Sequence, residues 1–319
     1  MTKSSLPLPR GLRTAAAVAL AALTAVAFTT VAASTAGASE LNRAIFNLDN
    51  DTISVILNDV RYPVDDFDFP AGTTHINNLY IGLFDGVTGY YFNDFVQGGN
   101  SSLILIDDVV LGGVAPTQTA TLTFADADPP TRFTIELFVE MLGDGSHGLR
   151  LTATITNLAG QPLDNAKFFV FSDVLVGATE GGDVTAFDAD SGIFYAFDNT
   201  NSPNTWFGVH SNGRYPLYYE GRAYQGPVGL APFHAALVTG ANLSNTVETT
   251  PQDQVAAWNW DLGSITATAT VGFAIAAHTD LASMVESLEA SVPDRMDLVF
   301  TDDFESGDTS SWGTVVGDP

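Results

Sequence analysis

Apolar side chains recur at every second position between residues 39 and 278, and this pattern limits the possible folds more than any other feature. Residues 52–57, 119–124, 149–156 and 264–271 alternate apolar residues with Thr, Ser or Arg. Successive side chains of a β-strand point to opposite faces, so a period of two predicts half-buried antiparallel strands. Residues 168–171 read Phe-Phe-Val-Phe, which predicts a central strand that is apolar on both faces.

Turn-forming residues separate these segments at intervals of about ten residues. Examples are Asp85-Gly86, Asp144-Gly145, Gly-Gly-Asp at 181–183 and Ser-Asn-Gly at 211–213. Short strands at this spacing are typical of sandwiches and barrels. The sequence shows neither a fixed-period repeat nor a linker-like gap. We therefore predict an all-β fold, one large antiparallel two-sheet β-sandwich of supersandwich type, over residues 39–292.

One short helix is predicted near the C-terminus. An apolar stripe at helical spacing is formed by Leu281, Met284, Val285 and Leu288. Thr279 is the expected N-cap, Asp280 complements the positive end of the helix, and Pro293 ends it. Residues 293–319 form a separate acidic tail rich in Gly and Ser.

The first 38 residues have the order of a secretory signal peptide. Three basic residues and no acid precede an apolar run at residues 14–33, and Ala36-Gly37-Ala38 then matches a cleavage site. We expect a bacterial Sec-type signal, a mature chain that starts at Ser39, and a secreted or surface-associated protein. No later segment of the sequence is apolar for long enough to predict a transmembrane helix.

The chain is strongly acidic, with 11 Lys and Arg against 37 Asp and Glu, and its formal charge of −26 becomes −29 without the predicted signal peptide. This charge repels phosphates and anionic lipid headgroups, which excludes nucleic acid and anionic membranes as partners. The sequence has no cysteine. Disulfides, thiolate zinc sites and a cysteine nucleophile are therefore also excluded.

The 28 Asp residues far outnumber the 9 Glu residues, and this excess has two explanations. Asp side chains bond the local backbone in turns, whereas calcium prefers several carboxylate and carbonyl oxygens. Asp188 and Asp190, in Asp-Ala-Asp-Ser-Gly, and the upstream Asp183 are the candidate calcium ligands. The late bidentate Glu of a complete calcium loop is missing, so turns without metal remain the alternative.

Residues 205–234 differ from the rest of the chain because they are rich in aromatic, Arg and His residues, with Gly and Pro throughout. We expect much of this segment to be loop, where binding sites are common. Aromatic faces can stack on sugar rings, and Arg or His can donate hydrogen bonds to hydroxyls or carboxylates. The predicted polysaccharide-binding residues are Trp206, His210, Arg214, Tyr218, Tyr219, Arg222, Tyr224 and His234. The alternative is that these side chains cover a sheet edge.

No motif identifies a reaction. Hydrolysis of a glycosidic bond needs two carboxyl groups, and Glu220, the only Glu in residues 205–234, is the nominee for an acid or base. Glu136 and Glu140 lie on one face of a predicted strand, where we expect them to be solvated. The leading function is a non-enzymatic, extracellular polysaccharide-binding protein, and the alternative is a glycoside hydrolase or lyase. Oligomeric state does not follow from the sequence.

Three segments carry a resemblance to known proteins. They are Thr-Asn-x-x-Gly-x-Pro-Leu at 156–163, a Phe-rich stretch that ends in Asp173, and Trp-Asp-Leu-Gly at 260–263. Through them the chain resembles a group of uncharacterised exported bacterial β-sandwich proteins. It is more loosely similar to the supersandwich of mutarotase-like carbohydrate-active proteins. The resemblance implies a β-sandwich, and no catalytic set matches in this sequence.

Overall fold

A computed structural model describes the greater part of the chain after the predicted signal peptide. It covers residues 45–49, 54–58, 62–68, 74–92, 103–107, 109–143, 147–178, 181–198, 200, 205–224 and 227–292. The predicted signal peptide and the predicted tail at 293–319 lie outside the described residues. No helix within these ranges is long and apolar enough to cross a membrane.

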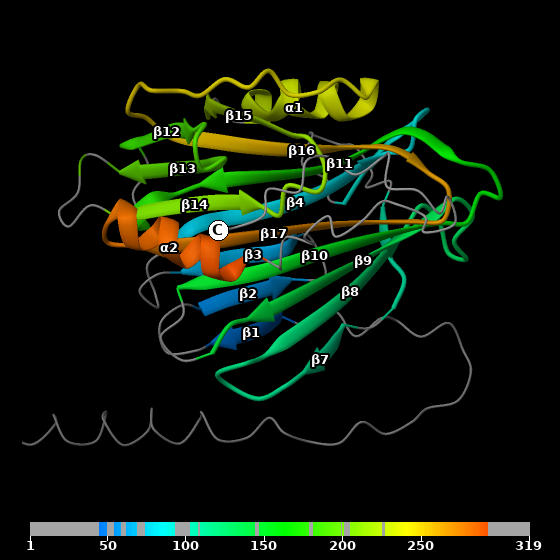
Figure 1. The fold of residues 1–319 in the computed structure, drawn as a ribbon, viewed down its shortest axis with the longest axis horizontal. Helices are drawn as coiled ribbons and strands as arrows, with labels where there is room; N and C mark the ends of the chain where they lie inside the picture. Colours follow the sequence, from blue (N-terminus) through cyan, green and yellow to red (C-terminus); the bar gives the residue numbers. More distant parts are fainter. Residues whose placement is uncertain are drawn as a thin grey trace, which may run out of the picture. The chain divides into compact units, whose positions relative to one another are not determined.

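The first of two antiparallel sheets, sheet A, has the strand order β1-β2-β3-β4-β11-β16-β15, with β5 also paired with β4 (Figure 1). Its strands are β1 (Ile45–Asp49), β2 (Ser54–Asn58), β3 (Tyr62–Asp68), β4 (Thr74–Phe84), β5 (Gly89–Tyr91), β11 (Leu163–Val174), β15 (Leu217–Ala223) and β16 (Gln254–Ile265). A short 3-10 turn, Val176–Ala178, follows β11.

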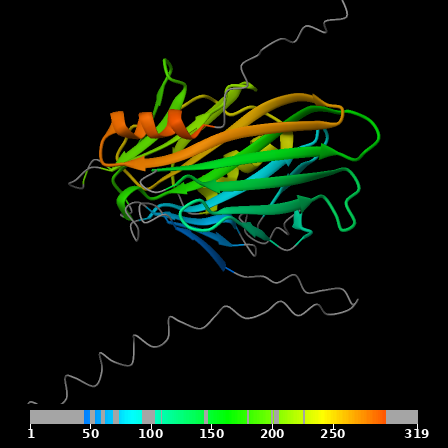
Figure 2. The ribbon, with the colours of Figure 1, turned by 60° about the horizontal axis from the view of Figure 1, so that its bottom comes forward.

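Sheet B has the order β12-β13-β14-β17-β10-β9-β8-β6, with β7 also paired with β8. Its strands are β6 (Ile104–Leu105), β7 (Val110–Gly112), β8 (Thr119–Ala125), β9 (Phe133–Met141), β10 (Gly148–Asn157), β12 (Asp183–Asp188), β13 (Ile193–Asp198), β14 (Trp206–Ser211) and β17 (Thr268–His278). The two sheets are the layers seen in Figure 2. The predicted all-β, two-sheet sandwich is confirmed.

Alternation along the strands places the main core between the sheets. In β9, every second residue from Phe133 to Met141 is buried. Glu136 is exposed, as predicted, whereas Glu140 on the same face is half-buried and paired with Arg150. The central strand β11 is apolar on both faces. Phe168 and Val170 face the core between the sheets, while Phe169 and Phe171 lie in a second cluster on the outer face of sheet A.

The predicted C-terminal helix is α2 (Leu281–Ser291), and it covers the outer face of sheet B across β14 and β17 (Figure 1). Met284 and Leu288 of the predicted stripe are fully buried there. A side chain at Gly208 of β14 would collide with this helix, because its Cβ would lie 2.7 Å from Leu288 Cδ1. The predicted cap is wrong by one residue. Asp280 is the N-cap and its Oδ1 accepts from Ser283 N at 2.9 Å.

Residues 205–234 are not mainly loop, which corrects the sequence-based expectation. They contain β14, β15 and most of a second helix, α1 (Pro227–Thr239). This helix packs on the outer face of sheet A, where Phe233 and Leu237 are buried. Its apolar residues surround it on all sides, so the sequence shows no amphipathic period, and Pro232 lies inside it. Because of these two features, the sequence did not predict the helix.

The alternation in residues 264–271 predicts a single strand, but the structure divides this segment between two strands. β16 ends at Ile265 in sheet A and β17 begins at Thr268 in sheet B. The two residues between them carry the chain from one sheet to the other. The side chain of Asn157 holds this crossing, because its Nδ2 donates to Ile265 O at 2.8 Å. Alternation of single residues does not reveal such a crossing, since Thr and Ala continue the pattern through it.

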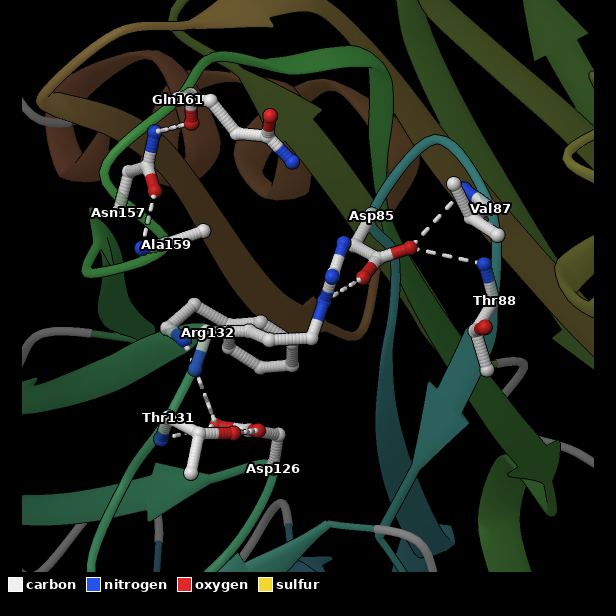
Figure 3. Close-up of polar contacts among 10 residues, drawn as sticks. Asp85, Val87, Thr88, Asp126, Thr131, Arg132, Asn157, Ala159 and Gln161 are labelled. Carbon is white, nitrogen blue, oxygen red and sulfur yellow. Dashed lines mark hydrogen bonds and ion pairs between the residues drawn. The ribbon is translucent and has the colours of Figure 1, made fainter.

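A polar cluster joins the two sheets at the end that carries the β4–β5 turn (Figure 3). Arg132, from the loop before β9, donates through Nε to Asp85 Oδ2 at 2.5 Å. The Asp85 side chain is fully buried and also accepts from Val87 N and Thr88 N at 2.9 and 2.8 Å. Asp126 in turn accepts from Arg132 N at 3.0 Å. This ion pair therefore fixes the β4–β5 turn of sheet A to the β8–β9 loop of sheet B.

Candidate functional site

The structure divides the predicted polysaccharide-binding residues among several places. Trp206 and His210 lie in β14 and alternate with the core residues Phe207 and Val209, so they belong to the outer face of sheet B. Trp206 packs beside the cluster under α2.

Four other predicted residues belong to the outer face of sheet A, near α1. Tyr218 and Tyr224 are half-buried against the cluster under this helix, and His234 is part of the helix itself. The Arg222 guanidinium lies 6.0 Å from the ring centre of Phe233. Burial lowers the pKa of His234 below its ordinary value. These residues therefore share a face, but they occupy the other side of the sandwich from Trp206.

The last two predicted residues are separate from both faces. Tyr219 points between the sheets, where its ring stacks on Phe187 at 4.0 Å and 18°. Arg214 is exposed in the turn after β14, with its guanidinium 5.6 Å from the ring centre of Tyr215. The segment therefore does not form one surface that includes all eight residues.

Glu220, the nominated acid or base, is 4% exposed on the outer face of sheet A. It forms an ion pair with Arg222, and its Oε2 accepts from Ser244 N at 3.1 Å. Residues around Thr246 pair with the outer edge of β15 at this position. Both oxygens of Glu220 are thus used in holding this edge of sheet A together.

A row of aromatic rings crosses the outer face of sheet B, and we name it the aromatic row. It consists of Tyr195, Phe197, Trp206, His278 and His147, all partly exposed. Phe197 lies directly opposite Trp206 across β13 and β14, and their rings stack with centres 4.6 Å apart at 28°. Tyr195 flanks Trp206 with its ring centre 5.8 Å away.

The row continues across β17 and ends near the start of β10. Trp206 is the direct cross-strand neighbour of His278, and side chains opposite each other in a sheet lie on the same face. The rings of His278 and His147 stack with centres 4.3 Å apart at 27°. Asp280, the N-cap of α2, places Oδ2 at 3.1 Å from His278 Nδ1. The row therefore places partly exposed aromatic rings beside a polar edge.

Sequence analysis identified only Trp206 of the aromatic row. Tyr195 and Phe197 had a usable signal, since they occupy alternate positions of the strand-like segment 193–198 and so share one face. No pattern in the sequence connects His147 with His278, because 130 residues lie between them. Only the pairing of β10 with β17 brings them together.

We expect the contribution of His147 to the free energy of unfolding to decrease as the pH falls below about 6.5. Burial, and then the nearby His278, lower the pKa of His147 below its ordinary value of 6.5. The unfolded chain therefore binds the proton more readily than the folded chain does, which favours unfolding at acid pH. Urea midpoints at pH 7 and pH 5 give the change in the free energy of unfolding for the parent and for His147→Gln. Between these two pH values the variant should lose less stability, or gain more, than the parent, and an equal change in both proteins would contradict the assignment.

The predicted metal ligands lie at two ends of β12. Asp188 and Asp190 are in the turn before β13, where Asp188 Oδ1 accepts from Asp190 N at 3.0 Å and Oδ2 accepts from Ser191 Oγ at 2.7 Å. These turn bonds lower the pKa of Asp188. Asp183 is five residues away at the other end of the strand, roughly 16 Å along it.

Asp183 is fully buried and lies directly opposite the fully buried Asp198 of β13. Burial, and then the negative charge of Asp198, raise the pKa of Asp183 to about 8. In the described residues no group of three or more His, Cys, Asp and Glu side chains is arranged to hold a metal ion. Among the acidic groups of the described residues with a resolved shift, Asp183 has the pKa that departs furthest from its ordinary value.

Comparison with protein-family descriptions and with curated protein sequences gives no match. Solved structures give matches at 6–12% identity. A galactose mutarotase related enzyme from Lactobacillus acidophilus is 8% identical with a TM-score of 0.37, and the match covers 74% of this chain and 97% of that one. The GalM/aldose epimerase homologue from C. elegans is 6% identical with a TM-score of 0.39, covering 74% and 98%.

A heparinase III is also similar, with 8% identity and a TM-score of 0.41. This match covers 76% of the present chain but only 36% of the heparinase chain, so the present chain spans about a third of that protein's length. The structural neighbours thus include aldose epimerase folds, in line with the looser of the two resemblances. No match supports the group of uncharacterised exported proteins. At these scores the matches say nothing about the function of this chain.

Proposed function

We propose that this chain is a secreted or surface-associated carbohydrate-binding protein that holds a neutral glycan against the aromatic row. The observation that carries the proposal is the alignment of partly exposed rings across three neighbouring strands, with Phe197 and Trp206 stacked at its centre. Flat aromatic faces offer apolar area to the C–H faces of sugar rings. His278 and Asp280, 3.1 Å apart at the edge, supply donors and acceptors for hydroxyl groups.

A neutral glycan fits this surface better than an acidic one. The two arginines among the predicted binding residues, Arg214 and Arg222, lie away from the aromatic row. Arg150 shares the outer face of sheet B, but it is already paired with Glu140 and the main-chain oxygen of Ser291. The chain as a whole carries a formal charge of −26, which repels polyanions. The nearest charged group along the row is the acidic Asp280. Sequence analysis left neutral and acidic polysaccharides open, and these placements favour the neutral class.

The Trp206→Ala variant is expected to bind a neutral polysaccharide at least about tenfold more weakly than the parent, because it removes the central ring of the row. The measurement is affinity electrophoresis or calorimetry of the mature protein against a panel of neutral and acidic glycans. Tyr218→Ala is the matched control, since it removes a half-buried aromatic ring from the outer face of sheet A. Melting temperatures establish that both variants are folded.

Three results would contradict the proposal. The parent could bind no neutral glycan in the panel. Trp206→Ala could bind as the parent does. Tyr218→Ala, and not Trp206→Ala, could lose binding, which would place the site beside α1. Release of shorter saccharides by the parent protein would instead favour the alternative of a polysaccharide-modifying enzyme.

A further inference from the structure

Two carboxyl groups meet at the junction of the two sheets, below the outer face that carries the aromatic row. Asp183 begins β12 and Asp198 ends β13, and both are fully buried. Asp198 follows Phe197 directly, so its side chain points inward where that of Phe197 points outward. Asp183 N and O exchange hydrogen bonds of 3.1 Å with Gln252, just before β16 of sheet A. The pair therefore lies where sheet B joins sheet A.

Three buried oxygens at this junction have no hydrogen-bond partner of normal geometry. They are Asp183 Oδ1, Asp183 Oδ2 and Gln254 Oε1. The backbone N–H of Val176 lowers the pKa of Asp183, but burial and the negative charge of Asp198 raise it by more. By contrast, Asp198 Oδ1 accepts from Thr200 N and Thr200 Oγ1, each at 2.7 Å. An unpaired buried acceptor is costly and rare in native proteins, so these oxygens require an explanation.

The amide of Gln254 cannot be reoriented to remove its unpaired oxygen. Its Nε2 donates to the main-chain oxygen of Asp183 at 2.7 Å, and also lies 3.0 Å from Glu248 O and 3.2 Å from Thr250 O. An amide oxygen in that position would face three acceptors. Gln254 is fully buried, and its amide, fixed by the bond to the main-chain oxygen of Asp183, leaves Oε1 unpaired.

We propose that Asp183 and Asp198, together with the amide oxygen of Gln254, bind a hard divalent cation of the calcium class. The unpaired atoms are all oxygens, the ligand type that calcium selects. Asp253 and Asp173 lie close enough to add negative potential at Asp183. This inference is independent of glycan binding.

This placement differs from the one expected from the sequence. The turn with Asp188 and Asp190 satisfies its own carboxylate oxygens through Asp190 N and Ser191 Oγ. The carboxylate oxygens of Asp183 are not satisfied in this way. The candidate site therefore lies at the opposite end of β12 from the one expected. Of the three predicted calcium ligands, only Asp183 belongs to it.

The experiment titrates CaCl2 into the chelator-treated mature protein at constant ionic strength and follows the melting temperature and the calcium bound by calorimetry. We expect one calcium to bind and the melting temperature to rise by several degrees. In Asp183→Asn both responses should disappear. Asp188→Asn is the matched control, since it makes the same carboxyl-to-amide change at the other end of β12 and should respond like the parent.

Each alternative result overturns the proposal. A melting temperature that calcium leaves unchanged in the parent shows that no cation binds to the folded state. A calcium response that persists in Asp183→Asn, or disappears in Asp188→Asn, places the ion elsewhere. Because Asp183→Asn is expected to be at least as stable as the parent without calcium, loss of its response would not reflect unfolding.

Discussion

The Asp183→Asn variant is expected to melt about 5–15 °C above the parent protein at pH 7 when divalent cations are removed. The pKa of Asp183 is about 8 in the folded chain, against an ordinary value of 3.8. Above about pH 4 the unfolded chain releases a proton that the folded chain retains. The free energy of unfolding therefore decreases as the pH rises, and the decrease reaches on the order of 4 kcal/mol at pH 7. An amide is neutral at every pH and removes this cost.

The measurement compares melting curves at pH 5 and pH 8, where the parent should lose stability with rising pH more steeply than Asp183→Asn. Asp188→Asn makes the same carboxyl-to-amide change at the other end of β12, where Asp188 is half-buried and its turn bonds lower the pKa. We therefore expect Asp188→Asn not to raise the melting temperature. An equal gain in both variants would show that lower net charge, rather than burial of Asp183, is responsible.

The Arg132→Met variant is expected to lower the free energy of unfolding by about 2–4 kcal/mol, because it leaves the buried carboxylate of Asp85 without its cation. The distance from Arg132 Nε to Asp85 Oδ2 is 2.5 Å, and the Asp85 side chain is fully buried. Since the Arg132 side chain is 34% exposed, solvent already weakens the pair, and the effect should be smaller than for a fully buried pair. Urea unfolding measures the change.

Arg150→Met provides the control. Arg150 pairs with Glu140 at 3.0 Å, but about 30% of each side chain is exposed, so its loss should cost less than about 1 kcal/mol. The double variant Asp85→Asn/Arg132→Met should recover part of the stability, because it also removes the buried charge. If Arg132→Met and Arg150→Met had equal effects, the pair at Asp85 would not hold the two sheets together.

Local patterns predicted the parts of the fold that depend on neighbouring residues. The period of two in residues 119–124 and 149–156 gave β8 and β10, and the apolar run 168–171 gave the central strand β11. Helix α2 has one apolar stripe and was found. Helix α1 packs its apolar residues on sheet A and also exposes Val238 at 45%, so its sequence lacks the polar face that marks a surface helix.

The candidate sites depend on contacts between residues far apart in the sequence. Tyr195, Trp206 and His278 share the aromatic row because β13, β14 and β17 are neighbours in sheet B. The sequence grouped Trp206 with Tyr218 and Arg222, which the two-layer fold places on the other outer face.

The sequence by itself determined that the chain forms an antiparallel β-sandwich, because side-chain alternation and turn residues act over a few positions. It also identified Asp183 and Trp206 as residues of interest. Only the tertiary structure decided which sheet each strand joins, that Asp183 meets Asp198 rather than Asp188, and that Trp206 lies beside His278. Strand order is set by packing across the whole core, and burial of a carboxyl group arises only when separate strands enclose it.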